Sequence, residues 1–261
     1  MRAGNEYEIS KSGSGVIMLK SLLIPFIARK RAGLKCIGGR NNRDTHVRGL
    51  VILLLLWLLS ACSPALQSAE LMSIDRDSIL FSDDFSNSNT GWGIWNREGA
   101  VIEHHNGGMR IRVNLTQYDF WTVAGQHFDD VQIEVDATKI GGPDDNDFGI
   151  ICRYQDRANF YMMVISSDGY YGIAKLKDGQ YSMIGSEQLQ YSDRIARGQR
   201  VNHLRADCIG STLRIYANDH LLMEAQDSDF AAGDVGLLAG AYDLKGVDIL
   251  FDNFVVKRPD K

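Results

Sequence analysis

The feature that most constrains this chain is an alternation of apolar and polar residues, with a period of two, that starts at Ile79. It is clearest in residues 131–137, where apolar residues hold the odd positions and Gln132, Glu134 and Asp136 hold the even ones. Because successive side chains of a β-strand point to opposite faces, this pattern predicts strands with one buried side and one solvent-facing side.

Similar segments recur along the chain and are separated by turn-forming residues. The expected strands are residues 79–85, 100–104, 109–115, 120–126, 131–137, 148–154, 160–166, 170–177, 200–208, 212–217, 221–225, 235–241 and 247–257. Only residues 192–197 could form a short helical turn. So many antiparallel strands in a short chain predict two packed sheets or a barrel. We therefore expect one all-β domain over residues 79–257, followed by a tail at 258–261.

An apolar run over residues 50–59 precedes the strands. It is shorter than the ~20 residues that a membrane-spanning helix needs and is typical of a signal peptide. The run ends in Leu59-Ser60-Ala61-Cys62, which resembles the bacterial lipobox. That resemblance implies cleavage before Cys62 and attachment of lipid to it. The alternative is a short buried helix that happens to end in a cysteine.

These observations predict the organisation of the first part of the chain. We expect a lipoprotein signal peptide at residues 47–61, Cys62 as the lipid anchor, and a flexible tether over residues 62–78. Residues 1–46 are an unusual extension before a signal peptide, and Val47 could be the true initiator. The predicted location is the bacterial cell envelope, outside the cytoplasm and anchored to the membrane.

The charge is unevenly divided along the chain. Residues 1–61 contain 10 Lys and Arg against 3 Asp and Glu, which leaves 18 basic and 30 acidic residues after the expected cleavage point, a formal charge of −12. An acidic surface repels phosphate backbones and offers no basic stripe, so the composition argues against nucleic acid as a partner. Calcium or a neutral polymer fits this charge better.

Two cysteines lie in expected strands of the exported part. Cys152 and Cys208 would be in an oxidising compartment, where a disulfide between them can persist. Two separately buried thiols are the alternative.

Nine short segments carry a resemblance to a known superfamily. They are residues 81–85 (FSDDF), 91–92 (GW), 148–154 (FGIICRY), 159–161 (NFY), 167–171 (SDGYY), 202–210 (NHLRADCIG), 213–218 (LRIYAN), 233–237 (GDVGL) and 251–254 (FDNF). In this order they resemble the concanavalin A-like lectin/glucanase superfamily, in particular bacterial laminin-G-like and keto-glycoside-hydrolase-like jelly rolls. The resemblance implies a two-sheet antiparallel jelly-roll sandwich of about 12 to 14 strands.

Strand parity suggests a carbohydrate-binding surface. It can place Arg153, Tyr161, Tyr171 and Lys175 on one face of three successive strands. Aromatic rings beside hydrogen-bond donors suit a sugar, which presents apolar C–H patches edged by hydroxyls. The alternative is that both tyrosines are structural and that Arg153 pairs with a carboxylate.

The resemblance also implies a structural calcium ion between the first and last strands. Asp252 stands at the matching position of the last strand, and Asp84 lies in the matching first strand. Carboxylate and main-chain oxygens suit this hard cation. Alternatively, Asp252 only caps backbone donors.

No catalytic residue is predicted. Glu134 and Asp136 resemble the Glu-x-Asp motif of laminarinase-type enzymes, but Thr138 and Lys139 stand where the third acid would be. The pair therefore reads as a solvated polar face. The sequence also contains no phosphate-binding loop, no Gly-x-Ser-x-Gly elbow and no Cys-x-x-Cys pair.

The sequence as a whole favours a lipid-anchored, extracytoplasmic β-sandwich that binds carbohydrate or another extracellular polymer without catalysis. One alternative is a hydrolase or lyase that acts on sugar derivatives. The other is a structural or adhesion module that binds protein partners.

Overall fold

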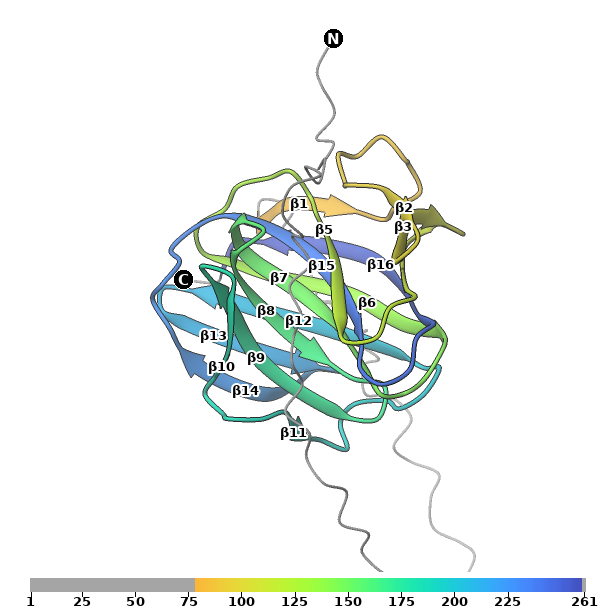
Figure 1. Cartoon of the computed structure of the whole chain (residues 1–261). Coiled ribbons are helices and arrows are strands. Elements are labelled where there is room, and N and C mark those ends of the chain that lie inside the picture. Colours follow the sequence, from red (N-terminus) through yellow and green to blue (C-terminus); the bar gives the residue numbers. More distant parts are fainter. Residues whose placement is uncertain (1–77, 260–261) are drawn as a thin grey trace, which may run out of the picture. The chain divides into compact units, whose positions relative to one another are not determined.

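The computed structural model describes residues 78–259, which form two antiparallel sheets packed face to face (Figure 1). The extension at 1–46, the signal peptide, Cys62 and most of the tether lie outside the described residues. Within residues 78–259 there is no helix long and apolar enough to cross a membrane. The first strand begins at Ile79 and the last ends at Lys257, where the alternating pattern of the sequence starts and stops.

Sheet A is the larger of the two sheets. Its strands, in spatial order, are β14 (His220–Gln226), β13 (Thr212–Ala217), β12 (Val201–Ile209), β6 (Val131–Gly141), β16 (Val247–Lys257), β4 (Gly108–Val113), β3 (Ala100–His105) and β2 (Trp95–Arg97), and β1 (Ile79–Asp83) pairs with β16. The alternating segment around Glu134 forms the centre of this sheet as part of β6, between β12 and β16.

Sheet B overlies sheet A in Figure 1. Its strands, in spatial order, are β10 (Gln180–Ile184), β9 (Tyr170–Lys177), β8 (Asn159–Ile165), β7 (Asn146–Asp156), β15 (Asp234–Ala241) and β5 (Tyr118–Val123), and β11 (Gln190–Tyr191) pairs with β9. The strands β7, β8 and β9 follow one another as a meander, whereas β15 and β5 reach this sheet from distant parts of the chain.

Two apolar clusters hold the sandwich together. The main core lies between the sheets and takes residues from both, such as Ile133 of β6 and Ile150 of β7. A second cluster contains residues of sheet B alone, among them Ile151, Phe160 and Leu238. Since Ile150 and Ile151 are neighbours in one strand, the second cluster lies on the face of sheet B that points away from sheet A.

Residues 78–259 contain 16 strands, more than the 12 to 14 predicted. Thirteen correspond to the expected segments, and β2, β10 and β11 were missed because each is short and lies at a sheet edge. Residues 192–197 contain a turn but no helix.

A disulfide joins the two sheets. Cys152 of β7 and Cys208 of β12 both belong to the main core and are bonded to each other across a sequence separation of 56 residues. The sequence left open either a disulfide or two separately buried thiols, and the structure contains the disulfide.

Gly172 allows the chain to fold back over sheet B. A Cβ at this position would lie 2.7 Å from Cε of Met183 and 2.8 Å from Cδ2 of Leu189. Both side chains pack on the second cluster. The missing side chain therefore lets β10 and the segment after it close over part of the outer face of sheet B.

Candidate functional site

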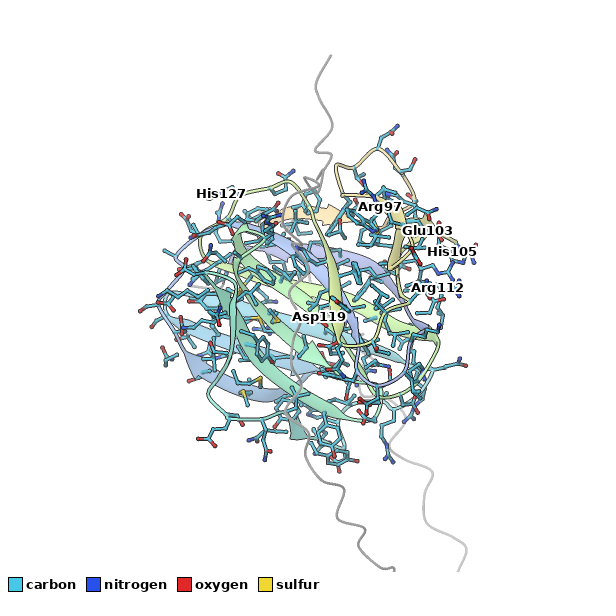
Figure 2. All side chains as sticks on the ribbon, in the orientation of Figure 1. Arg97, Glu103, His105, Arg112, Asp119 and His127 are labelled. Carbon is cyan, nitrogen blue, oxygen red and sulfur yellow. A yellow bond between two sulfur atoms is a disulfide. The ribbon has the colours of Figure 1, made fainter. Side chains whose placement is uncertain are left out.

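The outer face of sheet B carries two acidic residues beside its apolar cluster. Asp119 shares a strand face with Trp121 and Val123 of β5, and Asp147 shares one with Ile151 of β7. Both aspartates therefore point away from sheet A, next to an apolar surface. Figure 2 labels Asp119, which lies on β5 at the edge of sheet B.

Gly240 of β15 lies between the two aspartates, and its missing side chain lets their carboxyl groups approach each other. It is paired with Asp119 on one side and with Asp147 on the other. A Cβ on Gly240 would lie 1.9 Å from Oδ1 of Asp119 and 2.1 Å from Oδ1 of Asp147. The two oxygens are thus no farther than about 4 Å apart, a spacing at which two carboxylates cannot both ionise freely. We call Asp119 and Asp147 the acid pair.

The acid pair is largely buried and has no basic partner. Asp147 is 6% exposed and Asp119 is partly exposed, and one buried oxygen of each residue, Oδ2 of Asp119 and Oδ1 of Asp147, accepts no hydrogen bond from the rest of the described chain. Burial first, and then the charge of Asp147, raise the pKa of Asp119 well above its usual value. Burial raises the pKa of Asp147 to about 6, although hydrogen bonds from Asp119 and from the hydroxyl of Tyr242 oppose this shift.

These pKa shifts indicate one shared proton near neutral pH. A proton held between the two carboxyl groups satisfies both of them, and this titration belongs to the pair as a whole. The remaining carboxyl oxygens are acceptors within a few ångströms of one another. Convergent polar groups with shifted pKa values beside an apolar surface are typical of ligand sites.

Aromatic side chains share the outer face of sheet B with the acid pair. Trp121 is only partly buried and packs against Phe160, with ring centroids 5.2 Å apart. Tyr181 of β10 is 38% exposed and its hydroxyl lies 2.8 Å from Sδ of Met183; burial of this hydroxyl and then the charges of Asp147 and Asp119 raise its pKa. Two accessible aromatic rings thus lie on the same face as the acid pair.

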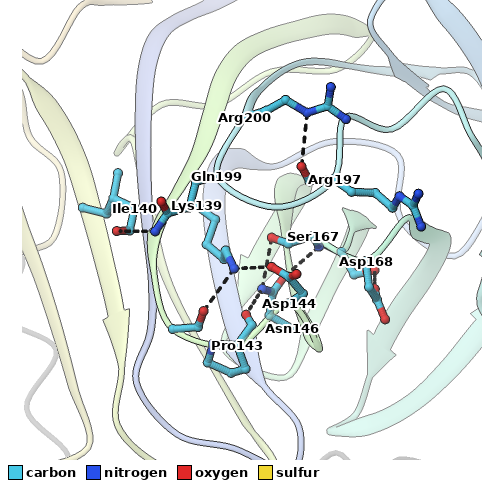
Figure 3. A network of polar contacts seen from close by, with 12 residues as sticks. Lys139, Ile140, Pro143, Asp144, Asn146, Ser167, Asp168, Arg197, Gln199 and Arg200 are labelled. Carbon is cyan, nitrogen blue, oxygen red and sulfur yellow. Dashed lines mark hydrogen bonds and ion pairs between the residues drawn. The ribbon is translucent and has the colours of Figure 1, made fainter.

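A polar network holds the start of β7, where Asp147 lies (Figure 3). Asn146 is fully buried, donates to the carbonyl of Pro143 (2.7 Å) and to Oγ of Ser167 (3.1 Å), and accepts from the Ser167 backbone N–H (3.0 Å). Lys139 donates to the carbonyl of Gly142 at 3.0 Å and pairs with Asp144. The hairpin between β6 and β7 is therefore fixed from both sides, and so is the position of Asp147.

The predicted sugar platform does share one face, but that face is the inner one. Tyr161 and Tyr171 belong to the main core between the sheets, at 0% and 8% exposure. The hydroxyl of Tyr161 donates to Oδ1 of Asp227 at 2.6 Å, and Lys175 pairs with Asp227 and Asp229. The two rings are covered by sheet A, so the prediction of a solvent-facing platform is corrected.

Arg153 reaches the same interior through a bulge. Its φ of +52° coincides with a register shift in β7, and this turns inward a side chain that simple alternation would direct outward. The guanidinium is 2% exposed and donates to the carbonyls of Gly210 (2.7 Å) and Phe230 (2.8 Å) and to Asp130 (3.0 Å). Arg153 thus connects sheet B to three loops and is not available to a sugar.

The predicted calcium ligands have local partners in the structure. Asp84 accepts from the backbone N–H (3.0 Å) and the hydroxyl (2.6 Å) of Ser86, and Asp252 accepts from the N–H of Asn253 (2.7 Å). Among residues 78–259, no group of three or more His, Cys, Asp or Glu side chains could hold a metal ion. A calcium site that relies on main-chain oxygens stays a prediction.

The outer face of sheet A has a shallow pocket of about 220 Å³. The residues that line it are Glu134, His203, Arg205, Tyr216 and Asp219. Nearly all their polar groups have partners within the chain: Glu134 pairs with Lys257 at 2.6 Å, and His203 with Asp136 at 2.8 Å. Arg205 pairs with Asp207 at 2.7 Å and stacks on Tyr216. This satisfied network leaves fewer free groups for a ligand than the acid pair does.

No protein-family model and no curated protein matches this chain. Solved structures do match it. A carbohydrate-binding module from Bacillus subtilis, CBM66, superposes with a TM-score of 0.53 at 22% identity, over 65% of this chain and 96% of the module. The described residues thus form a two-sheet antiparallel jelly roll.

Two further structures share the jelly roll, each with a TM-score of 0.50. One is a protein of unknown function with a galectin-like fold from Bacillus subtilis, at 12% identity over 69% of this chain and 96% of its own. The other is described as a native glycosidic hydrolase, at 14% identity over the same shares. At these identities the likeness establishes the fold alone, as the resemblance in the sequence implied.

The sequence contained a signal for the acid pair that the strand pattern alone did not single out. Asp119 and Asp147 occupy positions at which the same faces of β5 and β7 otherwise carry Trp121, Val123 and Ile151. A carboxyl in an apolar row is costly unless it has a partner or a ligand. Recognising it required knowing that β5 and β7 both flank β15, which only the sheet order shows.

Proposed function

We propose that this jelly roll binds carbohydrate on the outer face of sheet B, without catalysis. The observation that carries this proposal is the acid pair, which has no basic partner and lies on the same face of sheet B as the partly exposed ring of Trp121. A sugar fits such a surface because its C–H face packs on an aromatic ring while its hydroxyls bond to convergent polar groups.

Hydrogen-bonding capacity supports a polyhydroxylated ligand. An ionised carboxylate only accepts hydrogen bonds, whereas a protonated carboxyl donates one and accepts others. Sugar hydroxyls do both, so two neighbouring hydroxyls can satisfy the acid pair together. Two structural neighbours, a carbohydrate-binding module and a glycosidic hydrolase, agree with a ligand of this class.

Binding is favoured over hydrolysis by the spacing of the acids. Glycoside hydrolysis by the common routes needs two carboxyl groups about 5 to 10 Å apart, on either side of the scissile bond. The facing oxygens of Asp119 and Asp147 are no farther than about 4 Å apart, which leaves no room for a sugar ring between them. We therefore favour binding over glycoside hydrolysis at the acid pair.

The proposed location follows from the sequence. Cleavage before Cys62 and its acylation would tether the β-sandwich outside the cytoplasm, where polysaccharides are accessible. The disulfide between Cys152 and Cys208 is compatible with an oxidising compartment.

Substitution of Trp121 tests the proposed surface. We expect the purified β-sandwich to bind at least one member of a panel of soluble β-glucans, mannan, galactan and fructan, measured by calorimetry. Trp121→Ala should weaken that binding at least tenfold, since an aromatic anchor commonly contributes more than about 1.4 kcal/mol. Trp121→Phe retains a ring that can pack on a sugar and should lose less.

Tyr216→Ala is the matched control, because Tyr216 is a partly exposed aromatic residue on the opposite sheet. If Tyr216→Ala abolishes binding and Trp121→Ala does not, the ligand site is the pocket of sheet A. If the wild type binds none of these glycans, the proposed function is wrong. Release of new reducing ends from a bound glycan would show that the protein is an enzyme instead.

A further inference from the structure

We infer that the acid pair selects uncharged sugars, accepting hydrogen bonds from their hydroxyls while one proton is held between its two carboxyl groups, and that units which carry a carboxylate or sulfate are excluded. This inference rests on the proposed carbohydrate-binding function and names the ligand class of the same site. It follows from the charges that face the acid pair and from its single proton.

No positive charge faces the acid pair. The outward positions of the six strands β5, β15, β7, β8, β9 and β10 carry no Lys, Arg or His. The titratable groups that interact with the pair, directly or through Asp145 before β7, are acids and tyrosines: Tyr181 of β10, Tyr242 and Asp243 after β15, and Asp168 after β8. The adjoining loops also carry two lysines: Lys139 pairs with Asp144, and Lys245 follows Asp243 by two positions.

An anionic sugar would therefore bring a further negative charge into a region that already disfavours one. Burial first, and then Asp168 and Asp243, raise the pKa of Asp145 at the rim of the site. Like charges at close range in a partly buried site repel strongly, because solvent screens them poorly. A hydroxyl carries no net charge and escapes this penalty.

The acid pair holds one proton between its two carboxyl groups. Their facing oxygens are no farther than about 4 Å apart, a spacing at which both cannot ionise freely, and the pKa values of both acids are raised. Loss of this proton at high pH would leave two adjacent anions and no donor, and sugar binding should weaken.

The first experiment uses chemically matched ligands. The neutral polysaccharide that binds best in the panel is oxidised at its primary alcohols to carboxylates, and a portion is reduced back to the alcohol. We expect the oxidised form to bind at least tenfold more weakly at low ionic strength and the reduced form to regain affinity. Equal binding of the neutral and oxidised forms would overturn the inference while leaving the proposed function intact.

The second experiment tests the shared proton. Wild-type affinity for the neutral polysaccharide should fall at least tenfold from pH 6 to pH 10, whereas Asp119→Asn, whose amide is a permanent donor, should vary less than threefold. Asp119→Leu, which has no donor, should bind poorly throughout. The same fall in affinity with pH in wild type and Asp119→Asn would contradict the inference.

Infrared spectroscopy provides a readout that needs no ligand. A protonated carboxyl at pH 7 should give a C=O stretching band in the wild type that is absent in Asp119→Asn. If this band is missing from the wild type, both acids are ionised and the inference fails, even if glycans bind. If the band is present but no glycan binds, the proposed function is wrong, and the ligand class inferred from it falls as well.

Discussion

At the scale of single residues, the acid pair is the clearest conflict between stability and ligand binding. Burying two carboxyl groups without a basic partner costs free energy, because the ionised form loses its hydration. Asp119 and Asp147 lie where Leu238, Trp121 and Ile151 would otherwise continue an apolar surface. Residues that cost stability without a structural benefit are most often kept for a functional reason.

Asp119→Asn should therefore stabilise the protein at neutral pH. Because the folded-state pKa values of both acids are raised, the folded protein holds protons that the unfolded chain releases. The stability that these protons provide is complete below the unfolded pKa of about 4 and is lost as the pH rises through about 6. We expect Asp119→Asn to gain about 2 kcal/mol at pH 7 and little at pH 4.

Denaturant unfolding at both pH values measures this difference. Asp145→Asn is the control, because the pKa of Asp145 is also raised but the residue stands at the rim of the site. We expect it to gain less than Asp119→Asn does. A loss of stability for Asp119→Asn at pH 7, or an equal gain at both pH values, would show that the acid pair is ionised differently from our description.

At the scale of secondary-structure elements, the position of the acid pair depends on three strands that are far apart in sequence. β5 and β7 flank β15, and Gly240 of β15 leaves the space that the two carboxyl groups share. On the opposite side of sheet B, the disulfide joins β7 to β12. β7 therefore holds Asp147 while being fixed to the other sheet.

Removal of the disulfide should destabilise the sandwich strongly. The bridge closes a loop across 56 residues of sequence separation, for which the chain-entropy model gives about 4 kcal/mol. The double variant Cys152→Ala, Cys208→Ala should lose about that amount in denaturant unfolding, together with the packing of two fully buried sulfur atoms.

Wild-type protein in reductant is the control that leaves the packing of the sulfur atoms largely unchanged. It should lose most of the same stability. Two free thiols in non-reduced, denatured protein, together with no effect of reductant, would show that the bridge does not form.

At the scale of the whole molecule, the proposed lipid anchor would attach the protein to the membrane, and the β-sandwich would bind the sugar. A tethered sugar-binding sandwich would hold polysaccharide near the membrane or hold the membrane near a polysaccharide. The acidic character of the chain after Cys62 reduces non-specific attraction to anionic polymers, which agrees with the inferred preference for neutral sugars.

Cys62→Ser should release the protein from membranes. We expect the wild type, expressed in a bacterial host, to partition into the detergent phase of a phase-separating detergent and to incorporate labelled fatty acid. Cys62→Ser should do neither, because a serine at the cleavage site cannot receive the lipid. Ser68→Ala keeps both Cys62 and the disulfide and is the control for a substitution elsewhere in the expected tether. Equal labelling of wild type and Cys62→Ser would contradict the anchor.

The sequence by itself determined the strands and the class of fold, because the period of two in segments such as the one around Ile133 leaves few other ways to bury the apolar residues. It also contained the cysteines of the bridge. Local pattern could not show that Arg153 turns inward at a bulge, or that Tyr161 and Tyr171 face the second sheet. Parity assigns residues to a common face without saying what covers that face.

Only the tertiary structure decided where the candidate site is. Asp119 and Asp147 are 28 positions apart in the sequence, and Gly240, which allows them to meet, lies almost a hundred residues further on. Their contact is set by the order of strands in sheet B, which results from long-range pairing and not from any local preference. The physical reason is that hydrophobic patterning acts over neighbouring residues, whereas a binding site is made by strands that the packed core brings together.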